Sequence, residues 1–191
     1  GEAVGGANGA NRLSGNAISE TFVFGELAGR SAAALSHSAM PDIHHAAQPF
    51  LDIIAEASNR AGGGMTPTAA TASLQTIMAE DVGPFRTADG LRRALDNLAQ
   101  LAATLPELPT GGAMAFNQQL ADWFGLRNML VVARTIATAA LARTESRGAH
   151  QREDHPGLDQ AWTYNQVVRL DGDDIRLFRS EVRRLAQEEL A

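Results

Sequence analysis

Apolar residues recur at helical spacing soon after the start of the chain. Ile18, Phe22, Val23 and Leu27 follow the three- to four-residue period of an amphipathic helix. The pattern predicts a helix over residues 16–36. Small residues form a second face, which would pack closely against a sheet or another helix: Gly25, Ala28, Gly29 and Ala32. Because each helical glycine destabilises a helix by about 1 kcal/mol relative to alanine, tight packing is the expected compensation.

The middle of the chain predicts three further helices. Thr66 and Thr87 are candidate N-caps, and apolar residues follow each of them at helical spacing. We expect helices over residues 66–82 and 87–105, and one long helix or two in line, bent near Gly125, over residues 115–144. The connections between them are short, which favours an antiparallel three-helix bundle.

The segment before this bundle, residues 37–65, is predicted to be a connection that contains one short helix. Pro49 suits the first turn of a helix, so we expect the helix to run from there to about Arg60. Three consecutive glycines at residues 62–64 would end it. This glycine run is the strongest candidate for a domain boundary.

The pattern changes after residue 148. Strand-forming residues dominate positions 161–170, the turn sequence DGDD follows at 171–174, and apolar residues alternate over 175–178. This arrangement predicts a β-hairpin. Residues 180–190 are expected to form a last short helix.

Composition narrows the classes of function. The chain has 191 residues, a formal net charge of −6 and no cysteine. The lack of cysteine excludes disulfides and thiolate chemistry, and the negative charge argues against a nucleic-acid partner. Polar residues interrupt the longest apolar stretch, residues 126–142, at Arg127, Asn128 and Arg134. We therefore expect no transmembrane segment.

A glycine-rich stretch with candidate chemistry precedes the first helix. Gly5, Gly6 and Gly9 would let the backbone approach a ligand closely, and Arg12 is the only cation of the stretch. The helix that follows offers free N–H groups and a partial positive charge at its N-terminus. The combination predicts a site for an anionic group.

Two segments resemble the flavoprotein subunits of succinate dehydrogenase and fumarate reductase, a superfamily that includes L-aspartate oxidase. GANRLSGN at residues 9–16 resembles the segment near the end of the flavin domain. ESRGAHQRED at residues 145–154 resembles the C-terminal signature of the same family. With the periodicities, the resemblance implies a mainly α fold: the end of a flavin-binding domain (a loop plus a helix), then a three-helix bundle and a small C-terminal β-hairpin.

The domain organisation follows from this match. We expect residues 1–40 to be the C-terminal remnant of an FAD-binding domain and residues 41–65 to be a linker with a short helix. Residues 66–147 would form the helical bundle, and residues 148–191 a tail with the hairpin and a short helix. No strand, G-x-G-x-x-G turn and helix occur in sequence, so we expect a longer protein with its dinucleotide-binding core upstream of residue 1.

The resemblance also implies roles for residues near the start of the chain. Arg12 would clamp a carboxylate of a dicarboxylate substrate, which suits a planar, permanently charged guanidinium. Glu2 would hydrogen-bond the ribityl hydroxyls of FAD, and the backbone N–H groups of Ala17 and Ile18 would meet the pyrimidine end of the flavin ring. Asn8 departs from the family, in which many members have histidine, and this leaves the substrate and subfamily open.

The charged block at residues 145–154 receives no catalytic role. A mixed-charge cluster at a helix end is typically a salt-bridged interface, and His150 is expected to be structural. By resemblance, the block packs the helical domain against the flavin domain near the active site. His44 and His45 are adjacent and would diverge on a helix, so we expect them on the surface without a metal.

The implied function is that of an FAD-dependent oxidoreductase interconverting succinate and fumarate by hydride transfer at flavin N5. An iron–sulfur electron-transfer subunit is the implied partner, and the expected location is the cytoplasm or, as a peripheral protein, the cytoplasmic face of a membrane. Because no catalytic residue falls within this chain, we expect it to be inactive alone. Two alternatives stay open: an L-aspartate oxidase-type flavin oxidase and a non-catalytic all-α interaction module.

Overall fold

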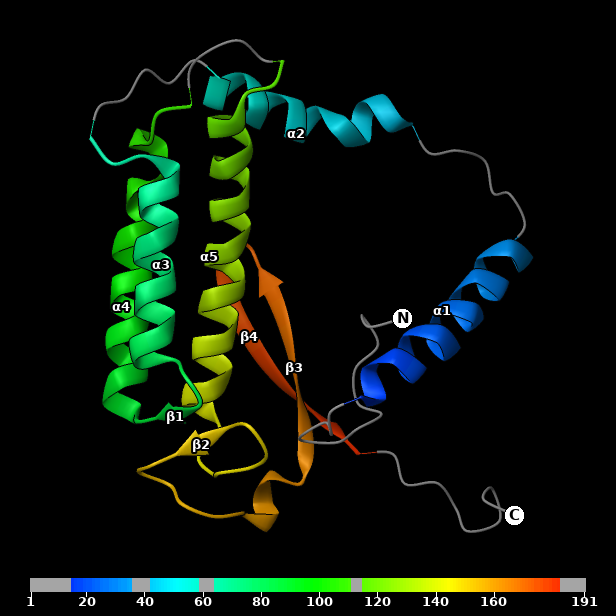
Figure 1. Ribbon diagram of the computed structural model, residues 1–191, viewed down its shortest axis with the longest axis vertical. Helices are drawn as coiled ribbons and strands as arrows, with labels where there is room; N and C mark the ends of the chain where they lie inside the picture. Colours follow the sequence, from blue (N-terminus) through cyan, green and yellow to red (C-terminus); the bar gives the residue numbers. More distant parts are fainter. Residues whose placement is uncertain (1–14, 36–41, 59–63, 111–114, 183–191) are drawn as a thin grey trace. The chain divides into compact units, whose positions relative to one another are not determined.

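The computed structural model describes residues 15–35, 42–58, 64–110 and 115–182. These residues form helices and a few short strands, coloured along the chain in Figure 1. The chain divides into two compact units, Gly1–Ile53 and Ile54–Ala191. Each unit is described by itself below.

Helix α1 (Asn16–Ala34) confirms the first predicted helix of the chain. It begins after Gly15, whose φ of 94° lies in the left-handed region that glycine adopts without strain. The apolar positions that predicted the helix have exposed side chains in the structure: Ile18, Phe22, Val23 and Leu27. Within the described residues, therefore, this helix has an apolar stripe without a core to cover it.

Helix α2 (Ile43–Ser58) corrects the prediction that a helix begins at Pro49. It begins six residues earlier, and Pro49 lies inside it. The side chain of Asp42 accepts a hydrogen bond from the backbone N–H of His45 at 3.2 Å, and its carbonyl accepts one from Ala46 at 3.1 Å. Asp42 therefore acts as the N-terminal cap, a stronger start signal than the proline.

Helices α3 (Pro67–Asp81), α4 (Ala88–Thr104) and α5 (Gln118–Ala142) form the predicted three-helix bundle. In Figure 1 the chain runs along α3, returns along α4 and runs back along α5, so consecutive helices are antiparallel. Side-chain oxygens of Thr66, Thr87 and Asn117 cap the three N-termini. The core consists of small and branched apolar residues: Ala70, Leu74, Leu91, Ala94, Leu98, Leu101, Leu126, Leu130, Ala133 and Ala137.

A short 3-10 turn, η1 (Leu105–Glu107), follows α4 and anchors the start of α5. The indole N–H of Trp123 donates to the carbonyl of Leu105 at 2.9 Å. This bond satisfies the polar end of an otherwise buried aromatic side chain.

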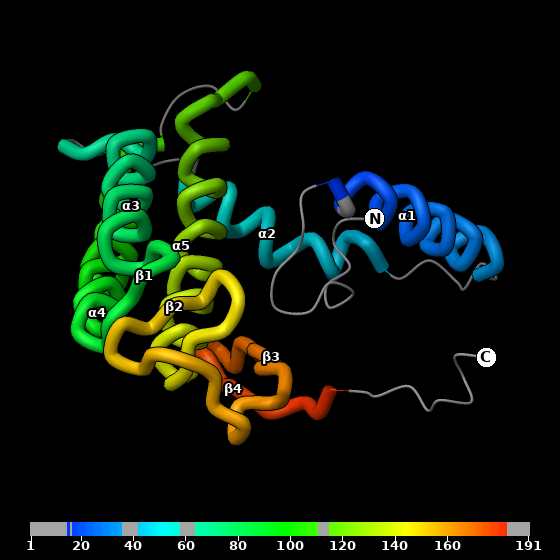
Figure 2. The backbone as a smooth tube through the Cα atoms, turned by 60° about the horizontal axis from the view of Figure 1, so that its bottom comes forward, coloured from blue at the N-terminus to red at the C-terminus, as the bar shows by residue number. Residues whose placement is uncertain are grey.

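Two strands of two residues each form a parallel pair that the sequence did not indicate. Strand β1 (Phe85–Arg86) pairs with β2 (Gln151–Arg152), although they lie far apart in the sequence. Figures 1 and 2 place both strands at the end of the bundle where α3 and α5 end. The segment between α3 and α4, expected only to break the helices, therefore also anchors the loop after α5.

A hairpin completes the described chain. After η2 (Gln160–Trp162), strands β3 (Tyr164–Asp171) and β4 (Asp174–Glu181) pair antiparallel around a turn at Gly172, where φ is 60°. The predicted hairpin is confirmed. The helix predicted over residues 180–190 is wrong for its first three residues, since Ser180 and Glu181 continue β4 and Val182 is not helical, and the rest of that prediction lies outside the described residues.

The structure as a whole confirms a mainly α fold with a three-helix bundle and a small C-terminal hairpin. The hairpin packs on the last helix of the bundle. Arg134 of α5 donates to the carbonyl of Asp173 at 3.0 Å, and Gln166 of β3 donates to the carbonyl of Ala139 at 3.3 Å.

Candidate functional site

The N-terminus of α1 is the first candidate region. Its first turn contains no acidic residue, so no carboxylate on the helix neutralises the partial positive charge at this end. Ala17 is half-buried, and the side chain of Ile18 is 68% exposed. Neither side chain is polar, so an electron-rich group at these two positions could meet only backbone N–H groups, and that of Ile18 donates to the carbonyl of Gly15 at 3.4 Å.

The other residues predicted for this region are Glu2, Asn8 and Arg12. They lie outside the described residues, so the structure does not place them relative to α1. Their roles stay predictions.

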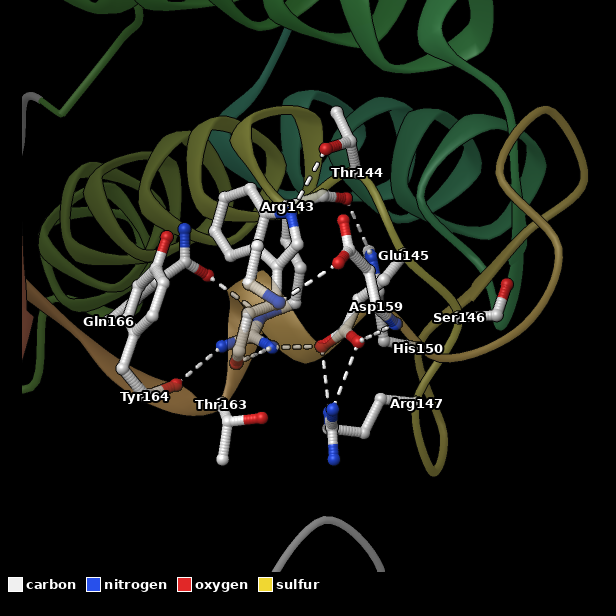
Figure 3. Close-up of polar contacts among 12 residues, drawn as sticks. Arg143, Thr144, Glu145, Ser146, Arg147, His150, Asp159, Thr163, Tyr164 and Gln166 are labelled. Atoms are coloured by element: carbon white, nitrogen blue, oxygen red, sulfur yellow. Dashed lines mark hydrogen bonds and ion pairs between the residues drawn. The ribbon is translucent and has the colours of Figure 1, made fainter. Parts of the chain in front are cut away.

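A network of charged residues after α5 is the second candidate region, and it is fully described. Its centre is Glu145, whose side chain is 0% exposed. Its two oxygens accept hydrogen bonds from Arg147, at 2.7 and 3.0 Å, and from the backbone N–H of Asp159, at 2.9 Å. A further bond comes from the guanidinium of Arg143. Figure 3 shows these donors converging on the carboxylate.

The electrostatics of Glu145 follow from these partners. Burial by itself would raise the pKa of this carboxyl group, because it penalises the charged form. The hydrogen bonds from Arg147, Asp159 and Arg143 outweigh burial and hold the pKa below the usual value of 4.5. Glu145 is therefore a charged structural centre and not a proton donor at neutral pH.

Arg143 connects this centre to the hairpin. The rings of Trp162 and Tyr164 stack with their centroids 5.1 Å apart, and the Arg143 guanidinium lies 5.1 Å and 5.7 Å from the two centroids. It also donates to the carbonyl of Tyr164 at 2.8 Å and to the side chain of Gln166 at 3.3 Å. A planar guanidinium suits this position because it combines stacking with several directed donors.

Arg152 closes the C-terminal end of α5. Its side chain is 1% exposed, and one nitrogen, Nη1, donates to the carbonyls of Ala140, Leu141 and Arg143 at 3.0 to 3.1 Å. The last carbonyls of a helix have no partner within the helix, and a cation there also interacts favourably with the helix dipole. Arg152 therefore satisfies both requirements from outside the helix.

Asp154 connects Arg152 to α4, another helix of the bundle. It accepts two hydrogen bonds of 2.8 Å from Arg152 and one of 2.9 Å from the backbone N–H of Ala88, at the start of α4. The hydrogen bond from Arg152 holds the pKa of the Asp154 carboxyl well below its usual range. One ion pair thus ties the end of α5 to the beginning of α4.

His150 lies beside this pair, between β1 and the end of α5. Its Nδ1 is 2.8 Å from Nη1 of Arg86, and its Nε2 is 3.2 Å from the carbonyl oxygen of Arg143. Burial lowers the pKa of the imidazole below its ordinary value of 6.5, and the charges of Arg86, Arg152 and Arg143 lower it further. The hydrogen bond to the carbonyl opposes these effects only in part.

The sequence anticipated a mixed-charge cluster at residues 145–154 but neither its burial nor its members from outside this block. Arg86 and Arg143 lie outside the block at residues 145–154, and the structure brings both to it. The charges pair within the segment and with the ends of α4 and α5. No local signal marks Arg86, which is 64 positions away from His150.

The two adjacent histidines of the chain lie in α2. His44 and His45 are exposed, as expected, and the described part of the chain contains no group of histidine and carboxylate side chains that could hold a metal.

Helix α5 is long and apolar enough to cross a membrane by length and composition, alone among the helices in the described ranges. Its leucines Leu120, Leu126 and Leu130 are buried in the bundle.

The fold is thus a three-helix bundle joined to a hairpin through a buried polar loop, and comparison with known proteins gives its family. The model of the family described as "Fumarate reductase flavoprotein C-term" matches residues 71–189. The chain therefore belongs to the C-terminal family of fumarate reductase and succinate dehydrogenase flavoproteins.

Individual relatives agree with this membership. The fumarate reductase flavoprotein subunit of Haemophilus influenzae is 32% identical over 189 residues, which cover 92% of this chain and 32% of the relative. L-aspartate oxidase of Caulobacter vibrioides is 36% identical over 167 residues, which cover 87% of this chain and 26% of the relative. The chain thus spans less than a third of the length of these relatives, which are flavoprotein oxidoreductases by name or family.

A solved structure extends the similarity to the whole chain. The Mycobacterium smegmatis Sdh1 complex in the apo form contains a chain that is 32% identical and superposes with a TM-score of 0.87. The match covers 100% of this chain and 34% of that one.

Proposed function

We propose that this chain is the C-terminal part of an FAD-dependent oxidoreductase that interconverts succinate and fumarate by hydride transfer at flavin N5. The observation that carries the proposal is the family match over residues 71–189, on a chain whose relatives include the flavoprotein of a fumarate reductase. The resemblance of residues 9–16 to the end of the flavin domain supports it from the other end of the chain.

The N-terminus of α1 fits an electron-rich cofactor ring. It has no acid in the first turn, and the side chains of Ala17 and Ile18 are apolar, so these two residues can offer only their backbone N–H groups as donors. These N–H groups would hold the pyrimidine end of FAD, and Glu2 would hydrogen-bond its ribityl chain. FAD, when bound, supplies the redox chemistry, and Arg12 binds and orients one carboxylate of the substrate beside it.

The domain division belongs to the same proposal. Residues 1–40 would complete an FAD-binding domain, and residues 66–147 would form the helical domain packed beside it. An iron–sulfur subunit would receive or deliver electrons, as in a complex attached to the cytoplasmic face of a membrane. The similarity to a chain of the Sdh1 complex supports assembly with further subunits.

An L-aspartate oxidase-type activity is the second candidate, because a relative with that name is 36% identical over 167 residues. The two candidates differ in substrate and not in cofactor. The residues proposed here would form one wall of a site, and one wall cannot position both reacting partners, so we expect the chain alone to be inactive.

The flavin spectrum of the full-length protein tests the proposal. We expect a yellow protein whose flavin band is bleached by succinate and restored by fumarate. Bleaching by aspartate and not by succinate would select the oxidase, and a colourless protein that takes up no FAD would refute both.

Arg12→Ala in the full-length protein tests the proposed substrate clamp. We expect dicarboxylate turnover to fall by at least about a hundredfold, because a charge-assisted bidentate contact is lost, while FAD stays bound. Arg30→Ala, which removes an exposed arginine on α1, is the matched control. Unchanged turnover in Arg12→Ala would contradict the clamp.

A further inference from the structure

Two side chains from one loop meet at the end of α5. The helix ends at Ala142, and the carbonyl of the next residue, Arg143, accepts hydrogen bonds from both Arg152 and His150. Arg152 is held by Asp154, whereas His150 is held by Arg86 of β1. His150 therefore joins β1, through Arg86, to the end of α5, whereas Arg152 joins β2 to the same helix end.

The partners of His150 define its tautomer. A guanidinium has donors and no acceptor, so Nδ1 of His150 must accept the hydrogen bond from Arg86. Its proton is then on Nε2, which donates to the carbonyl of Arg143. Arg86 is fixed independently, because its Nε donates to the carbonyl of Gly83 at 2.6 Å.

Protonation of His150 would oppose this arrangement directly. A second proton on Nδ1 would point at Nη1 of Arg86 and replace an attraction with a repulsion between two donors. The charged groups that act on the ring are guanidiniums from each neighbouring element: Arg86 on β1, Arg152 on β2 and Arg143 at the end of α5. The nearby carboxylates of Glu145 and Asp154 are already engaged by Arg143, Arg147 and Arg152.

The strand pair beside His150 is small. It is joined by backbone hydrogen bonds from Gln151 to the carbonyl of Pro84, at 3.1 Å, and from Glu153 to the carbonyl of Arg86, at 2.9 Å. With two residues in each strand, the pair has few backbone hydrogen bonds of its own, and the contacts of His150 and of the Arg152–Asp154 pair add to what holds it.

We propose that His150 is a proton-sensitive latch, whose neutral Nε2–H form holds β1 to β2 and to the end of α5 and whose protonation releases them. The contact therefore holds at neutral and higher pH and is released in acid. In the closed state the ring disfavours a second proton, whereas in the open state it can bind one. The open state therefore gains stability relative to the closed state as the pH falls below 6.5, the ordinary pKa of histidine. This inference rests on described contacts and does not depend on the proposed function.

Amide hydrogen exchange between pH 7.5 and 5 tests the latch. After correction for the intrinsic rates, opening at Gln151 and Glu153 should increase as the pH falls below 6.5, by at most about tenfold for each pH unit, which is the limit for opening coupled to one proton. Buried amides of the bundle, such as that of Leu98, should not follow the same curve. In His150→Gln, which does not titrate, this pH dependence should disappear.

His155→Gln is the matched control, because His155 lies in the same loop and its backbone, not its ring, makes the hydrogen bonds recorded for it in the described structure. This variant should keep the wild-type pH curve. If His150→Gln does not fold, nitrogen-15 NMR of the wild-type imidazole decides instead. We expect a neutral ring that carries its proton on Nε2 and whose titration midpoint lies below pH 6.5. A Nδ1–H ring, a midpoint at or above 6.5, or an opening curve unchanged in a folded His150→Gln would overturn the proposal.

Discussion

The bundle and the loop that follows it are held together by different physical means, although they share α5. Leu91, Leu98 and Leu126 fill the bundle with apolar surface that is completely buried. In the loop, the most buried side chains are Glu145 and Arg152, and hydrogen-bonded charges take the place of an apolar core. The first arrangement is insensitive to pH, whereas the second depends on the ionisation of each member.

The difference explains why a polar core is tolerated at this position. The loop meets the end of α5 and the start of α4, where helices expose unpaired carbonyl and N–H groups. Arg152 and Asp154 satisfy these groups, which leucines could not do. A charged core therefore fits the ends of a bundle, and an apolar core fits its middle.

Arg152→Ala should give the largest loss of stability. It would leave Asp154 without its main partner and the carbonyls at the end of α5 unsatisfied, and breaking such a buried pair costs about 3–5 kcal/mol. The measurement is the free energy of unfolding in denaturant at pH 7. Arg92→Ala is the control, because Arg92 forms an exposed ion pair. Equal effects of the two variants would contradict a structural role for the buried charge.

Leu126→Ala should be next, with a loss of about 2–5 kcal/mol from the apolar core. Its effect should be the same at pH 7 and pH 5, because no titrating group is involved. Thermal unfolding at the two pH values measures it. Val132→Ala, at an exposed position of the same helix, is the control and should change stability by less than about 1 kcal/mol. A strong pH dependence for Leu126→Ala would mean that the two regions are not physically distinct.

Glu145→Gln should destabilise the chain by about 1.5–3 kcal/mol at pH 7, because it weakens hydrogen bonds to two guanidiniums. Since the pKa of Glu145 is lowered in the folded chain, its contribution is present above 4.5 and is lost as the pH falls through the folded value. The wild type and the variant should therefore converge in acid. A constant difference down to pH 2 would show that the charge of Glu145 is not what stabilises the loop.

Arg176→Ala should have the smallest effect. Arg176 pairs with Asp171 at 2.7 Å across the hairpin, but both side chains are more than half exposed. Such pairs contribute about 0–1 kcal/mol and weaken in salt. Unfolding measured at low and high salt should show little difference between this variant and the wild type. A loss as large as that for Arg152→Ala would undo the distinction between buried and exposed charge.

The sequence predicted the parts of the fold that depend on neighbouring residues. Thr66 and Thr87 identified two helix starts, and the DGDD turn identified the hairpin, because caps and turns are made within a few residues. The prediction at Pro49 was wrong because Asp42 supplies the competing cap. Strands β1 and β2 were missed because two residues carry no periodicity.

Prediction of the candidate site was limited in the same way, because some of its residues come from other parts of the chain. The block at residues 145–154 was identified as a charged cluster, but Arg86 and Arg143 join it from outside. The predicted cofactor contacts of Glu2 and Arg12 stay predictions, because both residues lie outside the described ranges.

The sequence by itself determined the order of the helices, the caps of α3 and α4, the hairpin and the family resemblance, because each depends on local hydrogen bonding or on an uninterrupted run of residues. Only the tertiary structure decided which charges are buried together and in which protonation state they are held. Glu145 receives the backbone N–H of Asp159, His150 receives Arg86 from 64 positions away, and Arg152 caps the end of α5, and burial strengthens these interactions.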